Sequence, residues 1–141
     1  MNKFSIFCVS KFILLFFISV FSFSFSSAQG FEGYYQNPNI HNNTIVFVAE
    51  GDLWTVPLNG GLAQRLTSHI EEENFPSISP DGKIIAFSAS YEGPMEVYTM
   101  PIEGGLPTRW TYERDASITN SWTPDGKVIY NTRAYSKVPD N

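Results

Sequence analysis

Two histidines and one acidic run are the side chains best suited to chemistry in this sequence. His41 and His69 are the only histidines, and Glu71-Glu72-Glu73 follows the second one closely. A nucleophilic hydrolase needs a base within hydrogen-bond reach of its nucleophile and a third group that orients the base. Each histidine falls in an expected turn or link, and the sequence has no Gly-x-Ser-x-Gly elbow. We therefore expect solvated loop histidines and assign no catalytic residue.

The acidic run next to His69 also has the composition of a metal site. Protein metal sites collect several His, Cys or carboxylate ligands around one ion, and near-consecutive residues of one loop seldom converge in that way. No second histidine lies nearby in the sequence. We expect Glu71-Glu72-Glu73 to be a solvated acidic link, and we predict no metal ligand and no bound cofactor.

Other polar and aromatic positions have structural explanations. Asp52, Asp81 and Asp125 each adjoin a glycine, so we expect all three to have turn roles. Asn42-Asn43-Thr44 matches a glycosylation sequon, but we read it as a turn that carries no sugar. The large aromatic residues recur at regular positions and are expected to pack in the core. These are Trp54, Tyr98, Trp110 and Trp122.

The N-terminus has the pattern of a secretory signal. Lys3 and Lys11 provide positive charge, residues 12–25 are mostly apolar, and Ser26-Ser27-Ala28 is a small-residue cleavage site. The apolar run is shorter than the roughly 20 residues of a membrane-spanning helix. We expect residues 1–28 to form a signal-peptide helix that is cleaved before Gln29, with an uncleaved anchor as the alternative. The mature protein is then periplasmic or secreted, with no stable membrane association.

The charge balance limits the partners of the mature chain. The whole sequence has a net charge of −5, and loss of the two signal lysines makes it more acidic. An acidic surface argues against binding to nucleic acid or to anionic membranes. The only cysteine, Cys8, lies in the signal, so the mature chain forms no disulfide.

An internal repeat decides the expected fold. Ser79-Pro80-Asp81-Gly82-Lys83 recurs 44 residues later as Thr123-Pro124-Asp125-Gly126-Lys127. Further pairs have the same offset, namely Trp54 and Tyr98, Pro57 and Pro101, Gly60-Gly61 and Gly104-Gly105, Arg65 and Arg109, and Thr67 and Thr111. A unit of about 40–45 residues with four short strands is typical of one β-propeller blade.

The repeat divides the mature chain into about two and a half blades. We predict an all-β partial propeller of four-stranded antiparallel blades, with blade 1 at about 33–67, blade 2 at about 74–111 and the start of blade 3 at about 118–141. The first copy is four residues shorter, and the difference lies in the loop Ser90–Pro94 of the second copy. Because a closed ring needs more blades, we expect this chain to be a fragment of a longer protein.

The ordered motifs also resemble one known family, the tricorn-type proteases, which are relatives of the tail-specific serine peptidases. The resemblance covers Gly33 to about Pro139. The motifs that carry it are Gly33-Tyr34-Tyr35, Ile45-Val46-Phe47, Glu50-Gly51-Asp52-Leu53-Trp54, Arg65-Leu66-Thr67, Ala86-Phe87-Ser88 and the two Pro-Asp-Gly-Lys turns. One departure is His41-Asn42-Asn43, which stands where the later copies have Pro-Asp-Gly.

The resemblance implies a function that this segment cannot perform alone. Members of the family place a six-bladed and then a seven-bladed propeller before a PDZ domain within a catalytic core, which uses a serine nucleophile, a histidine base and further polar residues. The catalytic residues would follow Asn141, and the propellers would gate peptide or unfolded protein substrates. The full-length protein could then be a homo-oligomer. Two alternatives stay open: a non-enzymatic periplasmic propeller similar to the Tol-system scaffold, and a propeller fused to an α/β-hydrolase peptidase.

Overall fold

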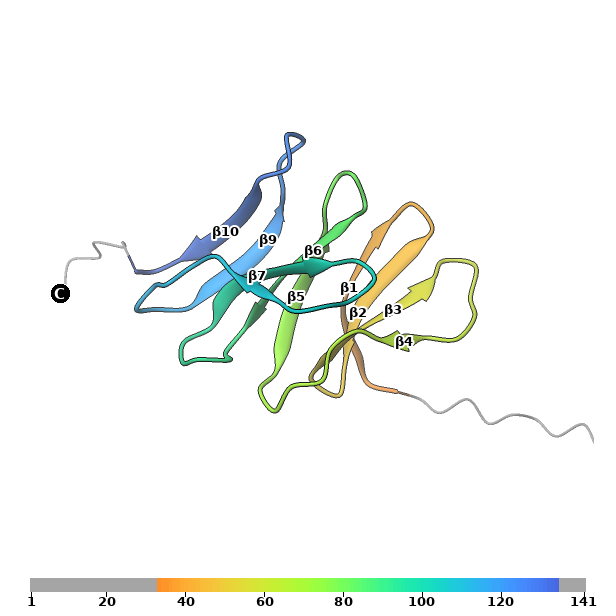
Figure 1. The fold of residues 1–141 in the computed structure, drawn as a ribbon, viewed down its shortest axis with the longest axis horizontal. Coiled ribbons are helices and arrows are strands. Elements are labelled where there is room, and N and C mark those ends of the chain that lie inside the picture. Colours follow the sequence, from red (N-terminus) through yellow and green to blue (C-terminus); the bar gives the residue numbers. More distant parts are fainter. Residues whose placement is uncertain (1–32, 135–141) are drawn as a thin grey trace, which may run out of the picture. The chain divides into compact units, whose positions relative to one another are not determined.

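The computed structural model describes residues 33–134, and all ten elements in this range are β-strands. The expected signal-peptide helix and the last seven residues lie outside the described range. Figure 1 shows the strands in three antiparallel sheets that follow one another along the chain. The prediction of an all-β chain with four-stranded antiparallel blades is confirmed.

The first two sheets have the same order of strands. Sheet one contains β1 (Tyr35–His41), β2 (Thr44–Ala49), β3 (Asp52–Pro57) and β4 (Gln64–Arg65). Sheet two contains β5 (Glu73–Ile78), β6 (Ile84–Ala89), β7 (Glu96–Pro101) and β8 (Thr108–Arg109). The third sheet pairs β9 (Ser117–Trp122) with β10 (Val128–Thr132). We call the first two sheets blade 1 and blade 2.

The two blades share their internal register. Phe47 pairs with Trp54 in blade 1, and Phe87 pairs with Tyr98 at the matching place in blade 2. In both blades the first strand has a bulge with a left-handed residue before a proline, at Asn37 (φ 47°) and Phe75 (φ 54°). A bulge bends a strand and increases its twist. The repeat in sequence is therefore also a repeat in backbone geometry.

The turn between the first two strands explains the departure at His41-Asn42-Asn43. In blade 1 this turn has two residues, because His41 pairs directly with Thr44. Asn42 has φ 49°, and the later turns place Gly82 (φ 74°) and Gly126 (φ 82°) in the same left-handed region. Asparagine is among the few residues other than glycine that tolerate this conformation. The first copy therefore keeps the backbone requirement in a shorter turn.

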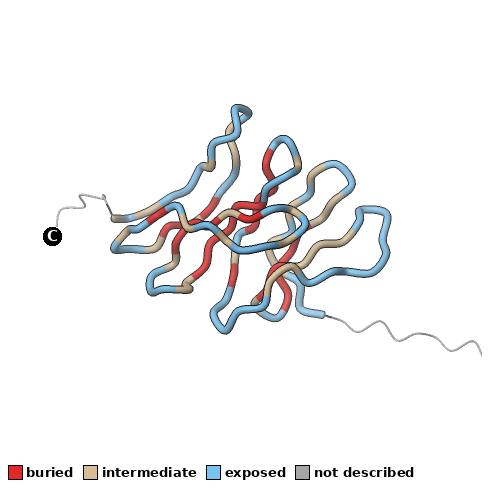
Figure 2. Tube along the Cα trace, viewed as in Figure 1, coloured by how far each residue is buried: buried red, intermediate tan, exposed pale blue. Residues whose placement is uncertain are grey.

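The core lies where consecutive sheets meet. Strand β5 contacts β1 and β2, and β9 contacts β5 and β6. Figure 2 shows the buried residues concentrated in the inner part of the sheets, above all in β2, β5, β6 and β7, with exposed residues at most hairpin tips. The core side chains are Val46, Val48, Leu53, Ile78, Ile85, Phe87, Ala89, Tyr98 and Met100. Burial of this apolar surface provides the main stabilisation of the packed blades.

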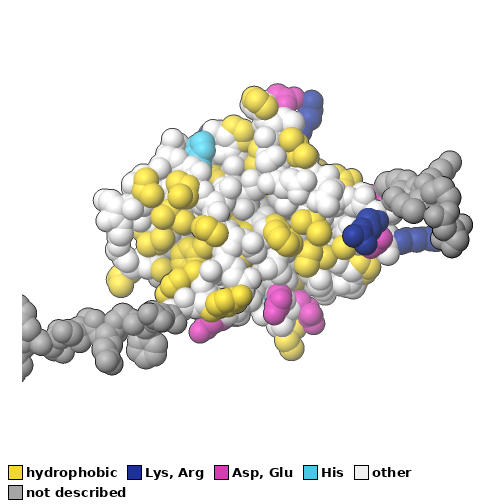
Figure 3. Space-filling model, turned by 180° about the vertical axis from the view of Figure 1, so that it is seen from behind, with side chains coloured by type: hydrophobic (Ala, Val, Ile, Leu, Met, Phe, Trp, Pro, Cys, Tyr) yellow, Lys and Arg dark blue, Asp and Glu magenta, His cyan; other side chains and the backbone are white. Residues whose placement is uncertain are grey.

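The expected roles of the large aromatic residues are only partly correct. Tyr98 is buried, and the indoles of Trp54 and Trp122 donate to the main-chain carbonyls of Ala49 and Ser77. Trp110, however, is 64% exposed, and the prediction of core packing is wrong for it. It lies just after the two-residue strand β8, at the edge of blade 2, and its indole N–H donates to the hydroxyl of Thr99 at 2.7 Å. Figure 3 shows other hydrophobic side chains spread over one face, with charged groups mainly at its edges.

Candidate functional site

The candidate site begins with a polar arrangement that occurs once in each blade. In blade 1, Asp52 forms an ion pair with Arg65, and in blade 2, Glu96 forms one with Arg109 at 3.1 Å. Both carboxylates are almost fully buried. Each arginine also donates from Nε to a main-chain oxygen two residues later, at 2.9 Å for Arg65 and 2.8 Å for Arg109. Arginine suits this role because its planar group can serve several acceptors at once.

A threonine hydroxyl completes the arrangement in each blade. Thr67 accepts from the backbone N–H of Leu53 at 2.9 Å, and Thr111 accepts from that of Val97 at 2.8 Å. Each hydroxyl donates in turn to a buried carboxylate. Thr111 uses Glu96 of its own blade, whereas Thr67 uses Glu73 from the next blade. The difference follows from side-chain length, because the first blade has an aspartate where the second has a glutamate.

These contacts overturn two expectations for acidic residues. Asp52 was expected to have a turn role, but it is a buried ion-pair partner that also accepts from the backbone N–H of His69 at 3.1 Å. Glu71 and Glu72 are exposed as expected, but Glu73 is fully buried. The prediction of a solvated link is therefore wrong for Glu73, because hydrogen-bond donors compensate for its burial. Asp81 does have its turn role, since it accepts from Ser79 and Lys83.

Glu73 joins three segments of the chain. Its carboxylate accepts from Thr67, from the hydroxyl of Tyr91 and from the backbone N–H of Leu53 at 3.1 Å. Burial raises the pKa of the Glu73 carboxyl, and the three donors oppose that rise only in part. Burial and the adjacent carboxylate also raise the pKa of Tyr91, so this phenol stays protonated and remains a donor.

The loop between β6 and β7 brings Tyr91 and Glu92 to the site. This loop contains the four residues that blade 1 lacks. Tyr91 packs on the ring of His69 with 4.1 Å between ring centroids, and Glu92 forms a 2.8 Å ion pair with Arg109. The insertion therefore places an aromatic ring and a carboxylate beside Glu73 and Arg109, and blade 1 has no counterpart of these two side chains.

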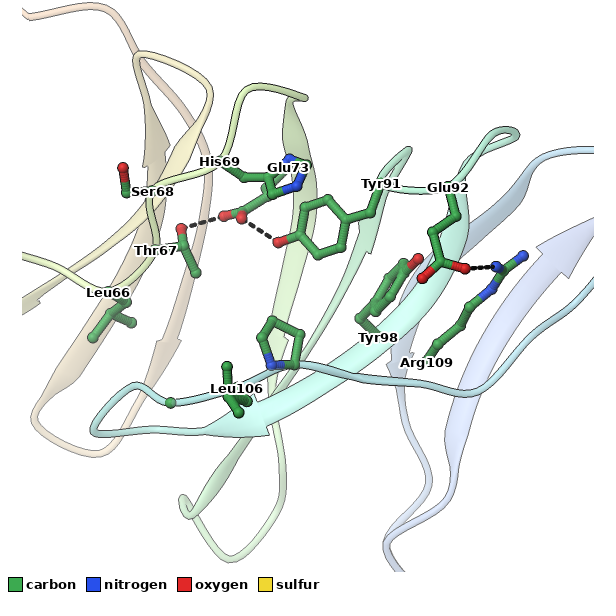
Figure 4. A pocket seen from close by; sticks show the side chains of 12 residues that line it. Leu66, Thr67, Ser68, His69, Glu73, Tyr91, Glu92, Tyr98, Leu106 and Arg109 are labelled. Carbon is green, nitrogen blue, oxygen red and sulfur yellow. Dashed lines mark hydrogen bonds and ion pairs between the residues drawn. The ribbon is translucent and has the colours of Figure 1, made fainter.

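A cavity of about 560 Å³ lies between the segment Leu66–Glu73 and the blade 2 residues Tyr91–Arg109. Figure 4 shows Thr67, His69 and Glu73 on one side of it, and Glu92, Tyr98 and Arg109 on the other. Leu66, Leu106 and Pro107 supply its apolar lining. Ligand sites combine apolar surface with convergent polar groups, and this cavity has both.

Tyr98 is the most informative polar group of this lining. The residue is 4% exposed, and its hydroxyl is buried without a hydrogen-bond partner among residues 33–134. Most buried polar groups have partners, so an orphan hydroxyl beside a cavity needs an explanation. Burial is the main cause that raises the pKa of Tyr98, and the hydroxyl therefore stays protonated. The sequence predicted the burial of this ring but not its orphan hydroxyl.

The two histidines do not meet in the structure as a catalytic pair. His69 is exposed as expected, and its Nδ1 accepts from the backbone N–H of Glu71 at 3.0 Å. His41 is half-buried, because its ring lies against Gly82 of the next blade, so the expectation of a solvated residue is wrong for it. Within residues 33–134 no three His, Cys, Asp or Glu side chains are grouped so that they could hold a metal ion. This part of the chain also has no helix long and apolar enough to cross a membrane.

Comparison with known proteins identifies the family. Residues 32–140 match the family described as the tricorn protease N-terminal beta propeller domain. The chain belongs to this family. A tricorn protease homolog of Streptomyces coelicolor is 39% identical over 64 residues, which is 45% of this chain and 6% of that protein. A tricorn protease homolog of Saccharolobus solfataricus is 35% identical over 57 residues, which is 40% of this chain and 5% of that protein.

Solved structures show the same likeness. A crystal structure of the tricorn protease superposes with a TM-score of 0.64 at 29% identity, covering 74% of this chain and 11% of that one. The TolB structure from Acinetobacter baumannii superposes with a TM-score of 0.63 at 26% identity, covering 74% of this chain and 28% of that one. The tricorn-type chain described here therefore corresponds to a small part of these proteins. The resemblance inferred from the sequence motifs is confirmed.

Proposed function

We propose that this chain is the N-terminal propeller segment of an exported tricorn-like serine protease, in which it gates peptide substrates for a catalytic domain elsewhere in the full protein. The family match over residues 32–140 is the observation that carries the proposal. The described residues offer a propeller scaffold, and the repeated polar networks serve packing. Catalysis is therefore assigned to other parts of the full protein.

The proposed mechanism is selection at the entrance. A propeller built from rigid blades has a central passage lined by successive blades, and only an extended or unfolded chain can thread such a passage. The ion pairs within each blade, and the hydrogen bond from Thr67 to Glu73 between the two blades, hold the strands in fixed positions. Peptides or unfolded proteins are thus the proposed substrates, and folded proteins are excluded by size.

The proposed location is the periplasm or the exterior of the cell. The N-terminal sequence supports it through its basic start, apolar run and Ser26-Ser27-Ala28. The mature protein should begin at Gln29, which N-terminal sequencing of the native protein tests directly. A mature protein that begins at Met1 would contradict signal cleavage.

A second candidate function is a non-enzymatic propeller that binds envelope proteins. The TolB likeness favours it, because its TM-score of 0.63 is nearly that of the tricorn structure, 0.64. Labelling of the full-length natural protein with a serine-directed probe separates the two candidates. The protease proposal predicts one labelled serine outside residues 29–141, located by mass spectrometry, whereas the scaffold proposal predicts no labelled serine.

A further inference from the structure

The cavity between blades 1 and 2 contains features that packing alone does not explain. It holds about 560 Å³ and lies beside the buried hydroxyl of Tyr98, which has no partner in the described part of the chain. One side of the cavity is formed in part by Tyr91 and Glu92, which lie in the inserted loop that blade 1 lacks. A loop that adds both an aromatic ring and a carboxylate to a cavity gives it specific recognition groups.

The charges around the cavity favour a cation. Four carboxylates lie at or next to the lining, and only two guanidinium groups compensate for them. The carboxylates are those of Asp52, Glu73, Glu92 and Glu96, and the guanidinium groups are those of Arg65 and Arg109. The chain as a whole is also acidic, with a net charge of −5. A positively charged ligand would thus be attracted to the site, and an anion repelled.

The groups at the cavity suit an ammonium ion on an aliphatic stem. One oxygen of Glu92 binds Arg109, and the 70% exposed side chain leaves the other oxygen available. The phenol oxygen of Tyr98 has no partner among residues 33–134, and it can accept a hydrogen bond once a movement of the exposed Glu92 side chain uncovers it. Leu66, Leu106 and Pro107 offer apolar surface for a chain of methylene groups. Long basic side chains pack in this way, with the stem on apolar atoms and the charged end on polar ones.

We propose that this cavity binds the lysine side chain of a peptide or protein. The ammonium group binds between Glu92 and the hydroxyl of Tyr98, and the four-carbon stem lies on the apolar lining (Figure 4). Arg109 holds Glu92 in place through one oxygen while the ligand uses the other. This binding does not depend on the proteolytic role.

The test measures the binding of small blocked peptides to the full-length natural protein by calorimetry. The probes are acetyl-Gly-Lys-Gly-amide, its norleucine counterpart without the charge, and unblocked Gly-Leu-Gly-amide, whose only ammonium is at its N-terminus. The lysine peptide is expected to bind about tenfold more tightly than either of the other two. Equal affinity for the lysine and norleucine peptides would overturn the proposal. Tighter binding of the unblocked peptide would assign the site to peptide N-termini instead and would also overturn it.

Three variants locate the binding. Tyr98→Phe removes a hydroxyl that has no partner, so the fold should persist while the affinity for the lysine peptide falls about fivefold. Glu92→Gln should lower that affinity about tenfold. Glu103→Gln is the matched control, because it removes the same charge from an exposed turn of blade 2 outside the lining. It should change affinity for the lysine peptide less than twofold. A loss equal to that of Glu92→Gln would show that the net charge of the protein, and not this cavity, governs binding, and would overturn the proposal.

Discussion

Glu73 and Ser117 occupy equivalent positions at successive sheet junctions. The backbone N–H of Glu73 donates to Gly51 at 2.8 Å, and 44 residues later the N–H of Ser117 donates to Met95 at 2.7 Å. The backbone contact is the same, but one junction has a buried carboxylate and the other a buried hydroxyl. The preceding blade differs in the complementary way, with Asp52 before Glu73 and Glu96 before Ser117. Each threonine hydroxyl therefore still finds one glutamate to accept its hydrogen bond. This relationship leads to the first two predictions.

Replacement of Glu73 by glutamine should remove a pH dependence of stability. The pKa of Glu73 is raised in the folded state, so the folded protein binds its proton more readily than the unfolded chain. The stability that Glu73 contributes is therefore fully present below the pKa of Glu73 in the unfolded chain, and it is lost as pH rises through the pKa of Glu73 in the folded protein. Hydrogen exchange at the Leu53 amide of the full-length protein should show protection that falls across this window, and Glu73→Gln should flatten the curve.

The exposed neighbour Glu72 supplies the control for that measurement. Glu72→Gln should leave the pH dependence of Leu53 protection unchanged, because Glu72 is solvated. Glu73→Ala should lower the local opening free energy by about 2 kcal/mol, because it leaves buried donors without an acceptor. Protection that rises with pH in the native protein would contradict the direction of the Glu73 pKa.

An exchange of side chains should convert the first junction into the second. Glu73→Ser alone is expected to cost about 2 kcal/mol, because Thr67 loses the acceptor of its hydroxyl. Adding Asp52→Glu should recover about 1 kcal/mol, because the longer side chain can reach Thr67 as Glu96 reaches Thr111. The check is a double-mutant cycle on local opening free energies. Strictly additive effects would show that the two positions do not compensate for each other.

Loss of the arginine should cost more in blade 2 than in blade 1. Arg109 is 16% exposed and serves both Glu96 and Glu92, whereas Arg65 is 45% exposed and pairs with Asp52 alone. Arg109→Ala leaves a buried carboxylate without a cation and should cost about 3 kcal/mol. Arg65→Ala should cost about 1 kcal/mol, because the 45% exposed Arg65 guanidinium is screened by water and pairs with one carboxylate where Arg109 pairs with two. Protection of the Val97 and Leu53 amides measures the two effects, and equal losses would contradict this ranking.

Gly82 and Gly126 offer a matched pair for the contact between blades. Both have left-handed backbones, with φ 74° and 82°, so alanine costs about 1 kcal/mol at either site. A Cβ atom at Gly82 would lie 3.1 Å from Cδ2 of His41, but one at Gly126 would meet nothing within 4 Å. Gly82→Ala should therefore be the more destabilising change in hydrogen exchange of the adjoining strands. Equal effects would show that the His41 ring moves away at no cost.

The sequence predicted the strands better than the site. Repeated turn residues located the blades because Pro-Asp-Gly and Gly-Gly impose backbone conformations that do not depend on distant neighbours. The apolar runs that follow the turns at Asn43 and Lys127 predict strands at Thr44–Ala49 and Val128–Thr132, with the ends that the structure gives. The residues after Gly60-Gly61 predict a fourth strand at Ala63–Thr67, but the structure has only Gln64–Arg65 there, because only these two residues pair with β3.

The polar site was missed for physical reasons. Comparison at the 44-residue offset favours identical residues, but Asp52 aligns with Glu96 and Glu73 aligns with Ser117. Burial of a carboxylate depends on donors from other strands, such as Tyr91 and the amide of Leu53, which are far away in the sequence. The one available signal was Arg65 and Arg109 at the repeat offset, since a repeated arginine in a blade implies a repeated acidic partner. The inserted loop was recognised as an insertion but not as the wall of a cavity.

Peptide hydrolysis by the full-length natural protein tests the central claim most directly. The measurement compares unfolded and folded forms of one substrate protein, with and without prior treatment with a serine-directed inhibitor. The account predicts cleavage of the unfolded form, little cleavage of the folded form, and loss of activity after inhibition. No cleavage of any peptide by protein with intact propellers, together with no labelling by the inhibitor, would contradict it.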